Sequence, residues 1–326
     1  MRWGILGPGR IARSFLTGLA GSATEHAVAV GSRDLDRARA VADDFDVPRA
    51  YGSYADLLAD DTVEAVYVAL PNALHAQWSD AAARAGKHVL CEKPLGRSAA
   101  EAEAMFGVAR ECGVWLMEAF MYRFHPRTLA LAELVARGEV GEPRLVRASF
   151  GFTVSDTANV RMSADLAGGA LMDVGCYPVN AARMLAGPVT GVTAAARWAE
   201  TGVDVTLAGT LDHAAGALSQ VACSLASSHH NAVQLVGTEG VVDLPSAFTP
   251  APDRPSVLVH TSGARGGERR EIRFHPVNQY TLEAEGFAAL VAAGPEAAAD
   301  LPQMPLAESL DNATTIDALL SAARGA

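Results

Sequence analysis

The chain has 326 residues, of which half are hydrophobic and 19% are charged, and its formal net charge is −11. This length is natural for two domains, and the composition provides for large cores and excludes global disorder. The acidic balance, with no block rich in Lys or Arg, argues against a nucleic-acid partner or an anionic membrane surface.

The first 120 residues alternate short apolar strands with helices. Strands are predicted over residues 3–6, 27–31, 65–70, a run that ends at 91, and 114–117, and helices over 10–20, 35–45, 75–85 and from Ser53 and Ser98. The run 65–70 is apolar throughout, which is typical of a strand buried on both faces. Strands that alternate with helices of this length predict a doubly wound parallel sheet, so we expect an α/β Rossmann domain over residues 1–120.

Residues 121–326 follow a different pattern, with one helix and then mainly strands. The helix begins near Pro126 and ends before Gly138, and every second residue from Val146 to Phe152 is apolar, as in a strand with one buried face. Further strands are predicted over 203–207, 216–225, 231–236 and 270–275, a hairpin or mobile loop over 249–270, and closing helices over 279–293 and 306–323. This alternation predicts an α+β domain whose mainly antiparallel sheet has one open face.

A glycine-rich loop, Gly7-x-Gly9-x-x-Ala12, follows the first strand and opens the first helix. In this context the pattern indicates dinucleotide binding, because Gly7 permits a tight turn and Gly9 lets backbone approach a pyrophosphate. Ala12 allows close packing of helix and strand, and the helix N-terminus faces the phosphates. The alternative is an ordinary strand–helix turn. The expected cofactor contacts of this loop are Gly7, Pro8, Gly9, Arg10 and Ile11.

The end of the second strand, "VGSRDLDRA", indicates which dinucleotide is bound. NAD-binding proteins carry a carboxylate here for the ribose hydroxyls, whereas this chain has Ser32 and Arg33. A hydroxyl and a guanidinium suit a 2′-phosphate, and Arg37 lies one helical turn further on, so we expect NADP, with NAD as the alternative. Asp34 either holds a ribose hydroxyl or caps the next helix.

The stretch "HVLCEKPLG" places Glu92, Lys93 and Pro94 directly after the fifth strand. Open α/β sheets bind ligands at the carboxyl edge of their strands. There, Lys93 can hydrogen-bond a substrate oxygen and stabilise an alkoxide; the alternative is a surface Glu/Lys pair on a loop. His75 either contacts the cofactor or is simply a first-turn residue of its helix. The other cofactor contacts expected near this edge are Leu70, Asn72, His75, Glu92, Lys93 and Met121.

Several of these motifs together resemble the Gfo/Idh/MocA oxidoreductase family. The resemblance rests on Pro71-Asn72, His75, residues 85–89, Glu92-Lys93-Pro94 and the stretches 117–126, 168–180 and 308–324. It implies that Lys93 acts on the substrate hydroxyl, that the Lys93–Pro94 peptide is cis, and that Asp173 and Tyr177 supply a second catalytic pair. Tyr177, where other members have histidine, is similar to the branch of dimeric dihydrodiol dehydrogenases, NADP-dependent aldose (D-xylose) dehydrogenases and glucose–fructose oxidoreductase. The resemblance also implies a subunit interface on the C-terminal sheet, hence a homodimer or homotetramer.

Asp173 and Tyr177 are four residues apart, so they share a face if their helix is regular. Pro178 removes one helical hydrogen bond, so the helix either starts or kinks here. A phenol has a pKa of about 10, and a nearby ammonium such as Lys93 lowers it enough for acid–base work. The alternative for Tyr177 is an ordinary core tyrosine. Further substrate contacts are expected at Tyr122 and Arg161, the latter with a surface ion pair as its alternative.

These features predict reversible hydride transfer between nicotinamide C4 and a carbinol carbon of a cyclic sugar, polyol or dihydrodiol, a small-molecule substrate. The alternatives are a reductase of a dicarbonyl sugar of the anhydrofructose type, and a dinucleotide-binding regulator without chemistry, which the presence of Lys93 disfavours. We expect no metal, because the adjacent His229 and His230 would point to opposite faces of a strand. Four scattered cysteines, no secretory signal and no apolar run of ~20 residues predict a cytoplasmic protein without a membrane span.

Overall fold

The computed structural model describes residues 1–297 and 304–325 and groups them into two compact units. The first unit combines residues 1–124 with residues 278–310, and the second combines residues 125–277 with those from 311 onward. The first is a parallel α/β unit and the second an α+β unit with a mainly antiparallel sheet, so the predicted fold class is confirmed.

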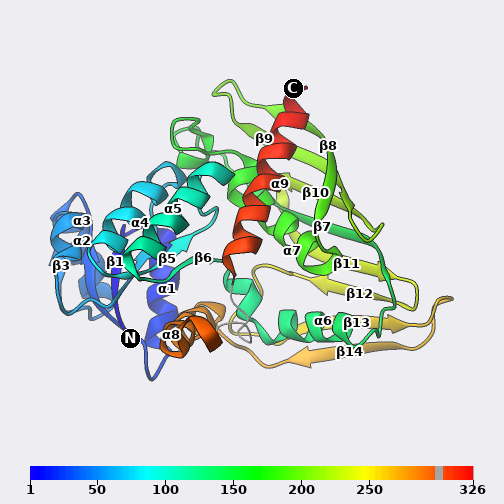
Figure 1. Cartoon of the computed structure of the whole chain (residues 1–326), viewed down its shortest axis with the longest axis horizontal. Coiled ribbons are helices and arrows are strands. Elements are labelled where there is room, and N and C mark those ends of the chain that lie inside the picture. Colours follow the sequence, from blue (N-terminus) through cyan, green and yellow to red (C-terminus); the bar gives the residue numbers. More distant parts are fainter. Residues whose placement is uncertain (298–303, 326) are drawn as a thin grey trace. The chain divides into compact units, whose positions relative to one another are not determined.

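The sheet of the first unit has six parallel strands in the order β3-β2-β1-β4-β5-β6 (Figure 1). The strands are β1 (Arg2–Leu6), β2 (His26–Gly31), β3 (Ala50–Tyr51), β4 (Ala65–Val68), β5 (His88–Glu92) and β6 (Leu116–Ala119). Every residue of β4 is fully buried, as its continuous apolar run predicts. The strand order places the β1 and β4 ends side by side, at the point where a doubly wound sheet binds its ligand.

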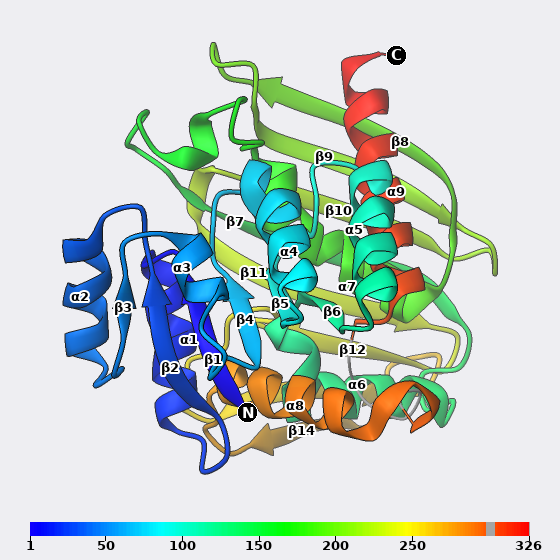
Figure 2. The same cartoon turned by 60° about the vertical axis from the view of Figure 1, so that its left-hand side comes forward.

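Helices cover both faces of this sheet, with α1 and α8 on one face and α4 and α5 on the other (Figure 2). The elements are α1 (Arg10–Ala20), α2 (Leu35–Asp44), α3 (Tyr54–Leu58), η1 (Asn72–Leu74), α4 (His75–Arg84), α5 (Ala99–Cys112), η2 (Met121–Phe124) and α8 (Gln279–Ala297). Their starts follow local chemistry: Ser98 Oγ accepts the Glu101 N–H at the start of α5, and Ser53 Oγ accepts the Asp56 N–H at the start of α3.

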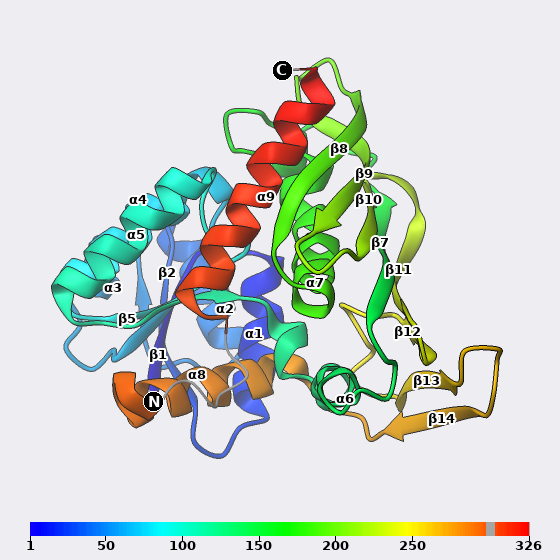
Figure 3. The same ribbon diagram turned by 45° about the vertical axis from the view of Figure 1, so that its right-hand side comes forward.

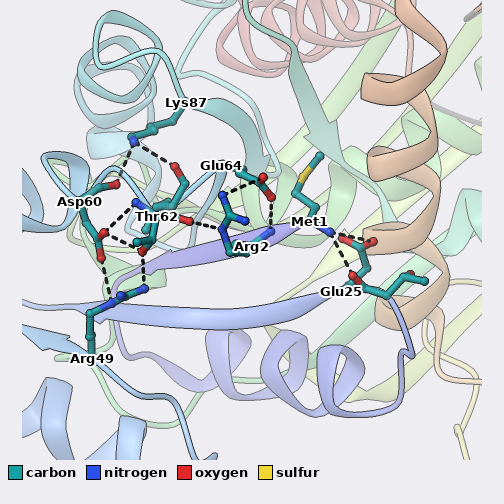
Figure 4. Close-up of polar contacts among 10 residues, drawn as sticks. Met1, Arg2, Glu25, Arg49, Asp60, Thr62, Glu64 and Lys87 are labelled. Atoms are coloured by element: carbon teal, nitrogen blue, oxygen red, sulfur yellow. Dashed lines mark hydrogen bonds and ion pairs between the residues drawn. The ribbon is translucent and has the colours of Figure 1, made fainter.

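A polar network fixes the amino-terminal edge of the same sheet (Figure 4). The Arg2 guanidinium and backbone N–H both reach the Glu64 carboxylate, and the terminal ammonium of Met1 reaches Glu25. Nearby, the buried Lys87 ammonium donates to the main-chain oxygens of Asp60 and Val63, each at 2.9 Å. These bonds hold the edge opposite the one at which ligands bind.

The second unit contains an eight-stranded sheet in the order β14-β13-β12-β11-β7-β10-β9-β8 (Figure 3). The strands are β7 (Pro143–Thr153), β8 (Val189–Trp198), β9 (Asp204–His213), β10 (Leu218–Ser224), β11 (Ala226–Gly237), β12 (Gly240–Pro245), β13 (Ser256–Ser262) and β14 (Arg269–Phe274). Only β7 and β10 pair in parallel; their other neighbours in the sheet are antiparallel. The segment predicted as a hairpin or mobile loop is the β13–β14 hairpin.

Helices pack on one face of this sheet, and Figure 3 shows no helix on the other face within the described residues. The helical elements are α6 (Pro126–Ala136), η3 (Val160–Met162), the π-helical turn η4 (Leu171–Gly175), α7 (Cys176–Ala186) and α9 (Leu306–Arg324). Val146, Ala148 and Phe150 are buried on the covered face, as predicted, whereas Phe152 is only partly buried. In the stretch of chain that the structure covers, no helix is long and apolar enough to cross a membrane.

Candidate functional site

The turn between β1 and α1 is shaped by two glycines with different roles. Gly7 has a φ of +96°, and a Cβ there would lie 2.8 Å from both the Ala69 oxygen and a methyl carbon of Leu70. Gly9 has an ordinary φ of −76°, and a Cβ there would meet nothing within 4 Å. Gly7 is therefore required by the turn itself, whereas the space above Gly9 is open to a ligand.

The start of α1 is suited to an anion. Gly9 is its N-cap residue, so no side chain caps the first N–H groups, and the first turn contains no acidic residue. Uncapped N–H groups and the positive end of the helix dipole bind phosphates. The residues present thus fit the pyrophosphate of a dinucleotide. Pro8 and Ile11 are partly buried in this turn, and Arg10 is exposed at the helix start.

Arg33 and Arg37 follow the end of β2. Burial raises the pKa of Tyr54, and the positive charges of Arg33 and Arg37, together with a hydrogen bond from Arg33, act to lower it. Ser32 is buried, and its hydroxyl accepts the Asp34 N–H at 3.2 Å. Asp34 caps α2 by accepting the N–H groups of Asp36 and Arg37, so of its two alternatives the structure shows the cap.

The Glu-Lys-Pro sequence lies at the carboxyl end of β5. Glu92 is buried: its carboxylate accepts the Tyr67 hydroxyl and, at 3.2 Å, the backbone N–H of Lys93. Lys93 is partly exposed, and the Lys93–Pro94 peptide is cis, as the family resemblance implies. Glu92 and Lys93 therefore do not form an exposed surface pair; the glutamate turns into the sheet and orients the backbone that carries the lysine.

His75 begins α4 and is fully buried. Its Nδ1 lies 2.8 Å from the Pro94 oxygen and its Nε2 lies 2.9 Å from the Leu70 oxygen. Burial lowers the pKa of His75 more than these two carbonyl acceptors raise it. The His75 ring thus links the loop after β4, at Leu70, to the loop after β5, at Pro94.

Glu118 in β6 is a buried ionisable residue that was not predicted as a site residue from the sequence. It is 3% exposed, and its Oε1 accepts the Leu95 N–H at 3.0 Å. Burial raises the pKa of Glu118 to about 7, although Ser309, the Leu95 N–H and the positive charges of Lys93 and Arg123 all act to lower it. A carboxylate inside the apolar strand "LMEA" is the sequence signal that could have identified it.

The remaining predicted residues of the first unit lie in short helical turns. Asn72 begins η1, directly after the loop that contains Leu70. Met121 and Tyr122 are buried in η2, and the Tyr122 ring packs edge-on against Phe120.

In the second unit, the structure brings Arg161 and Asp173 together. Arg161 Nε donates to Asp173 Oδ2 at 2.5 Å, and the Asp173 side chain is only 14% exposed. Asp173 lies in the π-helical turn, and Pro178 is in the first turn of α7, where a missing N–H costs little. The irregularity expected from Pro178 is therefore a π-turn that leads into a new helix.

Tyr177 is buried among aromatic rings of the second unit. Its ring centroid is 5.5 Å from that of Phe150 and 5.3 Å from that of Phe248. Arg127, which was also not predicted as a site residue, is 1% exposed and donates to the main-chain oxygens of residues 245–247, directly before Phe248. Arg127 thus fixes the segment that packs on the Tyr177 ring, and burial lowers its own pKa to about 10.

The fold and the first unit's ligand edge define a Rossmann-type dinucleotide-binding oxidoreductase. Residues 1–120 match the sequence profile described as "Oxidoreductase family, NAD-binding Rossmann fold", and residues 128–243 match the "GFO/IDH/MocA C-terminal domain". The chain belongs to the Gfo/Idh/MocA oxidoreductase family.

Similar proteins include two whose names belong to the predicted branch, and a sugar 3-ketoreductase. The chain is 41% identical over 325 residues to D-xylose 1-dehydrogenase (NADP(+)) 2 of Haloferax volcanii, covering 99% of this chain and 97% of that one. It is 39% identical over 278 residues to mouse trans-1,2-dihydrobenzene-1,2-diol dehydrogenase, covering 83% and 80%. A solved structure of KijD10, a 3-ketoreductase from Actinomadura kijaniata in complex with NADP and TDP-benzene, superposes with a TM-score of 0.89 at 33% identity, covering 99% and 97%.

Proposed function

We propose that the chain is an NADP-dependent oxidoreductase that transfers hydride between nicotinamide C4 and a carbinol carbon of a cyclic sugar, polyol or dihydrodiol. The observation that carries this proposal is the shared carboxyl edge of the parallel sheet. That edge has the open space above Gly9, the uncapped start of α1 and the Lys93 loop. The named relatives, a D-xylose dehydrogenase and a dihydrodiol dehydrogenase, support this substrate class.

The residues at this edge fit NADP. In the proposal, residues 7–11 hold the pyrophosphate, and Ser32, Arg33 and Arg37 hold the 2′-phosphate. Leu70, Asn72, Glu92 and Met121 line the nicotinamide end, with His75 behind them. When bound, NADP supplies the hydride acceptor or donor at C4.

Lys93 and Tyr177 together provide the acid–base catalysis at the substrate oxygen. The Lys93 ammonium donates a hydrogen bond that stabilises the developing alkoxide; in oxidation the Tyr177 phenolate takes the hydroxyl proton, and in reduction the Tyr177 phenol returns it. Asp173, oriented by Arg161, accepts hydrogen bonds from neighbouring substrate hydroxyls, and Tyr122 completes the substrate contacts.

A second candidate function is reduction of a keto sugar. Its support is the similarity to KijD10, a 3-ketoreductase whose solved structure contains NADP and TDP-benzene. The same residues serve this direction, because Lys93 and Tyr177 then deliver the proton to the carbonyl oxygen. A regulator without chemistry has less support, since Lys93, Asp173 and Tyr177 are all retained.

We also propose that residues 1–120 bind the cofactor, that residues 121–326 bind substrate and mediate assembly, and that the protein is a cytoplasmic homodimer or homotetramer. The helix-free face of the second sheet supports the assembly. It bears a cavity of about 1050 Å³ lined mainly by small and polar residues from all eight strands, such as Ser149, Thr193 and Ala208. Four free cysteines support a reducing compartment.

The test is a fluorescence titration with NADPH and NADH, followed by an NADPH absorbance screen. The panel contains aldoses, inositols, trans-dihydrodiols and a TDP-keto sugar. Tight NADPH binding with turnover of one class establishes the enzyme and its substrate. Tight binding with no turnover in either direction contradicts the proposed enzymatic function. Light scattering on the same sample reports the assembly state.

A further inference from the structure

The single peptide group between Pro94 and Leu95 is held at both ends by buried ionisable side chains. Its C=O lies 2.8 Å from His75 Nδ1, and its N–H donates to Glu118 Oε1 at 3.0 Å. His75 comes from the start of α4 and Glu118 from the middle of β6, so the contacts reach the loop from two different elements.

Both side chains are anchored in the first unit. His75 is 0% exposed, and its second nitrogen faces the Leu70 oxygen at 2.9 Å. Because carbonyl oxygens only accept hydrogen bonds, a proton on Nδ1 is what holds the Pro94 oxygen. Glu118 lies opposite Cys91 in the β5–β6 register, and Lys93, Arg123 and Ser309 are the neighbours that influence its charge.

The orientation of the Pro94–Leu95 peptide determines how much rotational freedom the backbone has next to Lys93. A residue has two soft backbone torsions, and the proline ring already fixes φ of Pro94. Orientation of the following peptide fixes ψ, which is the remaining torsion of Pro94. On its other side, Lys93 donates its own N–H to the buried Glu92 carboxylate at 3.2 Å. The backbone on both sides of Lys93 is therefore held from within the sheet.

We infer that His75 and Glu118 are positioning residues that act as one clamp on the Pro94–Leu95 peptide and so set the direction of the Lys93 side chain. This inference rests on the proposed role of Lys93 in hydride transfer. Neither residue needs to contact substrate, and His75 then affects catalysis through Pro94. Release of either end frees ψ of Pro94. Misplacement of a catalytic group by about 1 Å costs about 10²-fold in rate.

The chemistry of the clamp distinguishes two isosteric variants of His75. In His75→Asn, the amide nitrogen takes the place of Nδ1, so the donor to the Pro94 oxygen is kept. In His75→Gln, the amide nitrogen takes the place of Nε2, so a donor faces the Leu70 oxygen and the donor to the Pro94 oxygen is lost. At Glu118, Gln keeps the oxygen that accepts the Leu95 N–H, whereas Ala removes it.

The kinetic test measures kcat, KM and the NADPH dissociation constant for these variants. His75→Gln and Glu118→Ala should each lower kcat by about 10²-fold with KM and NADPH affinity near wild type. His75→Asn and Glu118→Gln should retain most of kcat. The double variant His75→Gln/Glu118→Ala should be little slower than either single variant, because both release the same peptide. Three results would each overturn the clamp. They are losses of kcat that multiply in the double variant, equal losses of kcat in His75→Asn and His75→Gln, and a large rise in the NADPH dissociation constant.

A matched control separates positioning from stability. His213 is also a buried histidine with both ring nitrogens hydrogen-bonded, to the Gly187 oxygen and the Ser219 hydroxyl. His213→Gln should lower the melting temperature as His75→Gln does, while kcat per folded molecule stays at the wild-type value. A similar loss of kcat in both would show that general destabilisation, and not the clamp, is responsible.

The sequence provides a readout that does not depend on turnover, because Lys87 and Lys93 are the only two lysines in the chain. Protein grown with isotope-labelled lysine therefore gives two side-chain signals by NMR. In His75→Gln and Glu118→Ala the Lys93 signal should shift, while that of Lys87, held by two main-chain oxygens (Figure 4), should not. An unchanged Lys93 signal refutes the clamp. A wild-type protein that turns over nothing refutes the proposed function and leaves this readout intact.

Discussion

Neutralising Glu118 should change how the stability of the first unit depends on pH. In the folded protein, burial raises the pKa of this carboxyl from an ordinary value of 4.5 to about 7. Between these two pH values the folded state keeps a proton that the unfolded state has lost. The folded state thus binds more protons, so the free energy of unfolding falls as the pH rises through this window. Below pH 4.5 the Glu118 carboxyl is protonated in both states and does not lower the free energy of unfolding. Above about pH 7 it is ionised in both states, and the full destabilisation from burying its charge is present.

The magnitude follows from the same two values. At about 1.4 kcal/mol per pH unit, the interval from 4.5 to about 7 corresponds to about 3 kcal/mol. Glu118→Gln removes this titration and keeps the acceptor for the Leu95 N–H. Relative to wild type, the variant should therefore gain about 3 kcal/mol in unfolding free energy between about pH 4.5 and about pH 8.

Urea unfolding followed by tryptophan fluorescence is the assay. Three of the four tryptophans, Trp3, Trp78 and Trp115, lie in the first unit, so the signal reports mainly on that unit. An exposed glutamate of the same unit, Glu111, provides the control for loss of one charge in Glu111→Gln. Parallel pH profiles for wild type and Glu118→Gln would refute the reasoning, because they would show that the carboxyl ionises equally in both states.

Four other outcomes test the site. Gly9→Ala should leave the melting temperature unchanged and weaken NADPH binding in fluorescence titration, whereas Gly7→Ala should destabilise the fold, because its Cβ would meet backbone at 2.8 Å and its φ is positive. Arg33→Ala should raise KM for NADP far more than KM for NAD in steady-state assays; equal effects would remove Arg33 from the 2′-phosphate site. Lys93→Ala should lower kcat by about 10³-fold or more with NADPH affinity retained, and normal turnover would exclude its role. Arg127→Met should cost about 3 kcal/mol in unfolding free energy, since three main-chain oxygens lose their donor; an unchanged denaturation midpoint would contradict this.

Most elements of the first unit could be predicted because their signals are local; the two-residue strand β3 was not predicted. Capping serines, the apolar run of the fourth strand and the glycine loop each determine a boundary within a few residues of sequence. The turn at Gly7 is one of these local signals. Its conformation depends on the glycine itself and on the ends of β2 and β4, which flank it. The carboxyl edge of the sheet, and therefore the region of the site, follows from the same pattern.

The second unit was harder to predict, because its sheet depends on contacts between distant residues. Strands β8 and β12 were not predicted; β8 in particular is rich in alanine and threonine and has weak alternation. Nothing local indicates that β10 pairs in parallel with β7. The contact of Arg127 with residues 245–247 spans more than a hundred positions, and the Arg161–Asp173 pair depends on how a loop returns to a π-turn.

The first unit is completed only by residues 278–310, which are synthesised late. Trp3 packs on Phe287 with ring centroids 5.5 Å apart, and Thr281 donates to the Gly18 oxygen at 2.7 Å, so α8 covers the face of α1 and β1. A nascent chain on the ribosome therefore exposes this apolar face until residues 125–277 have also been made, a period in which chaperone binding is expected. For the same reason, a chimera that exchanges cofactor specificity with a relative has to transfer residues 278–310 together with residues 1–124.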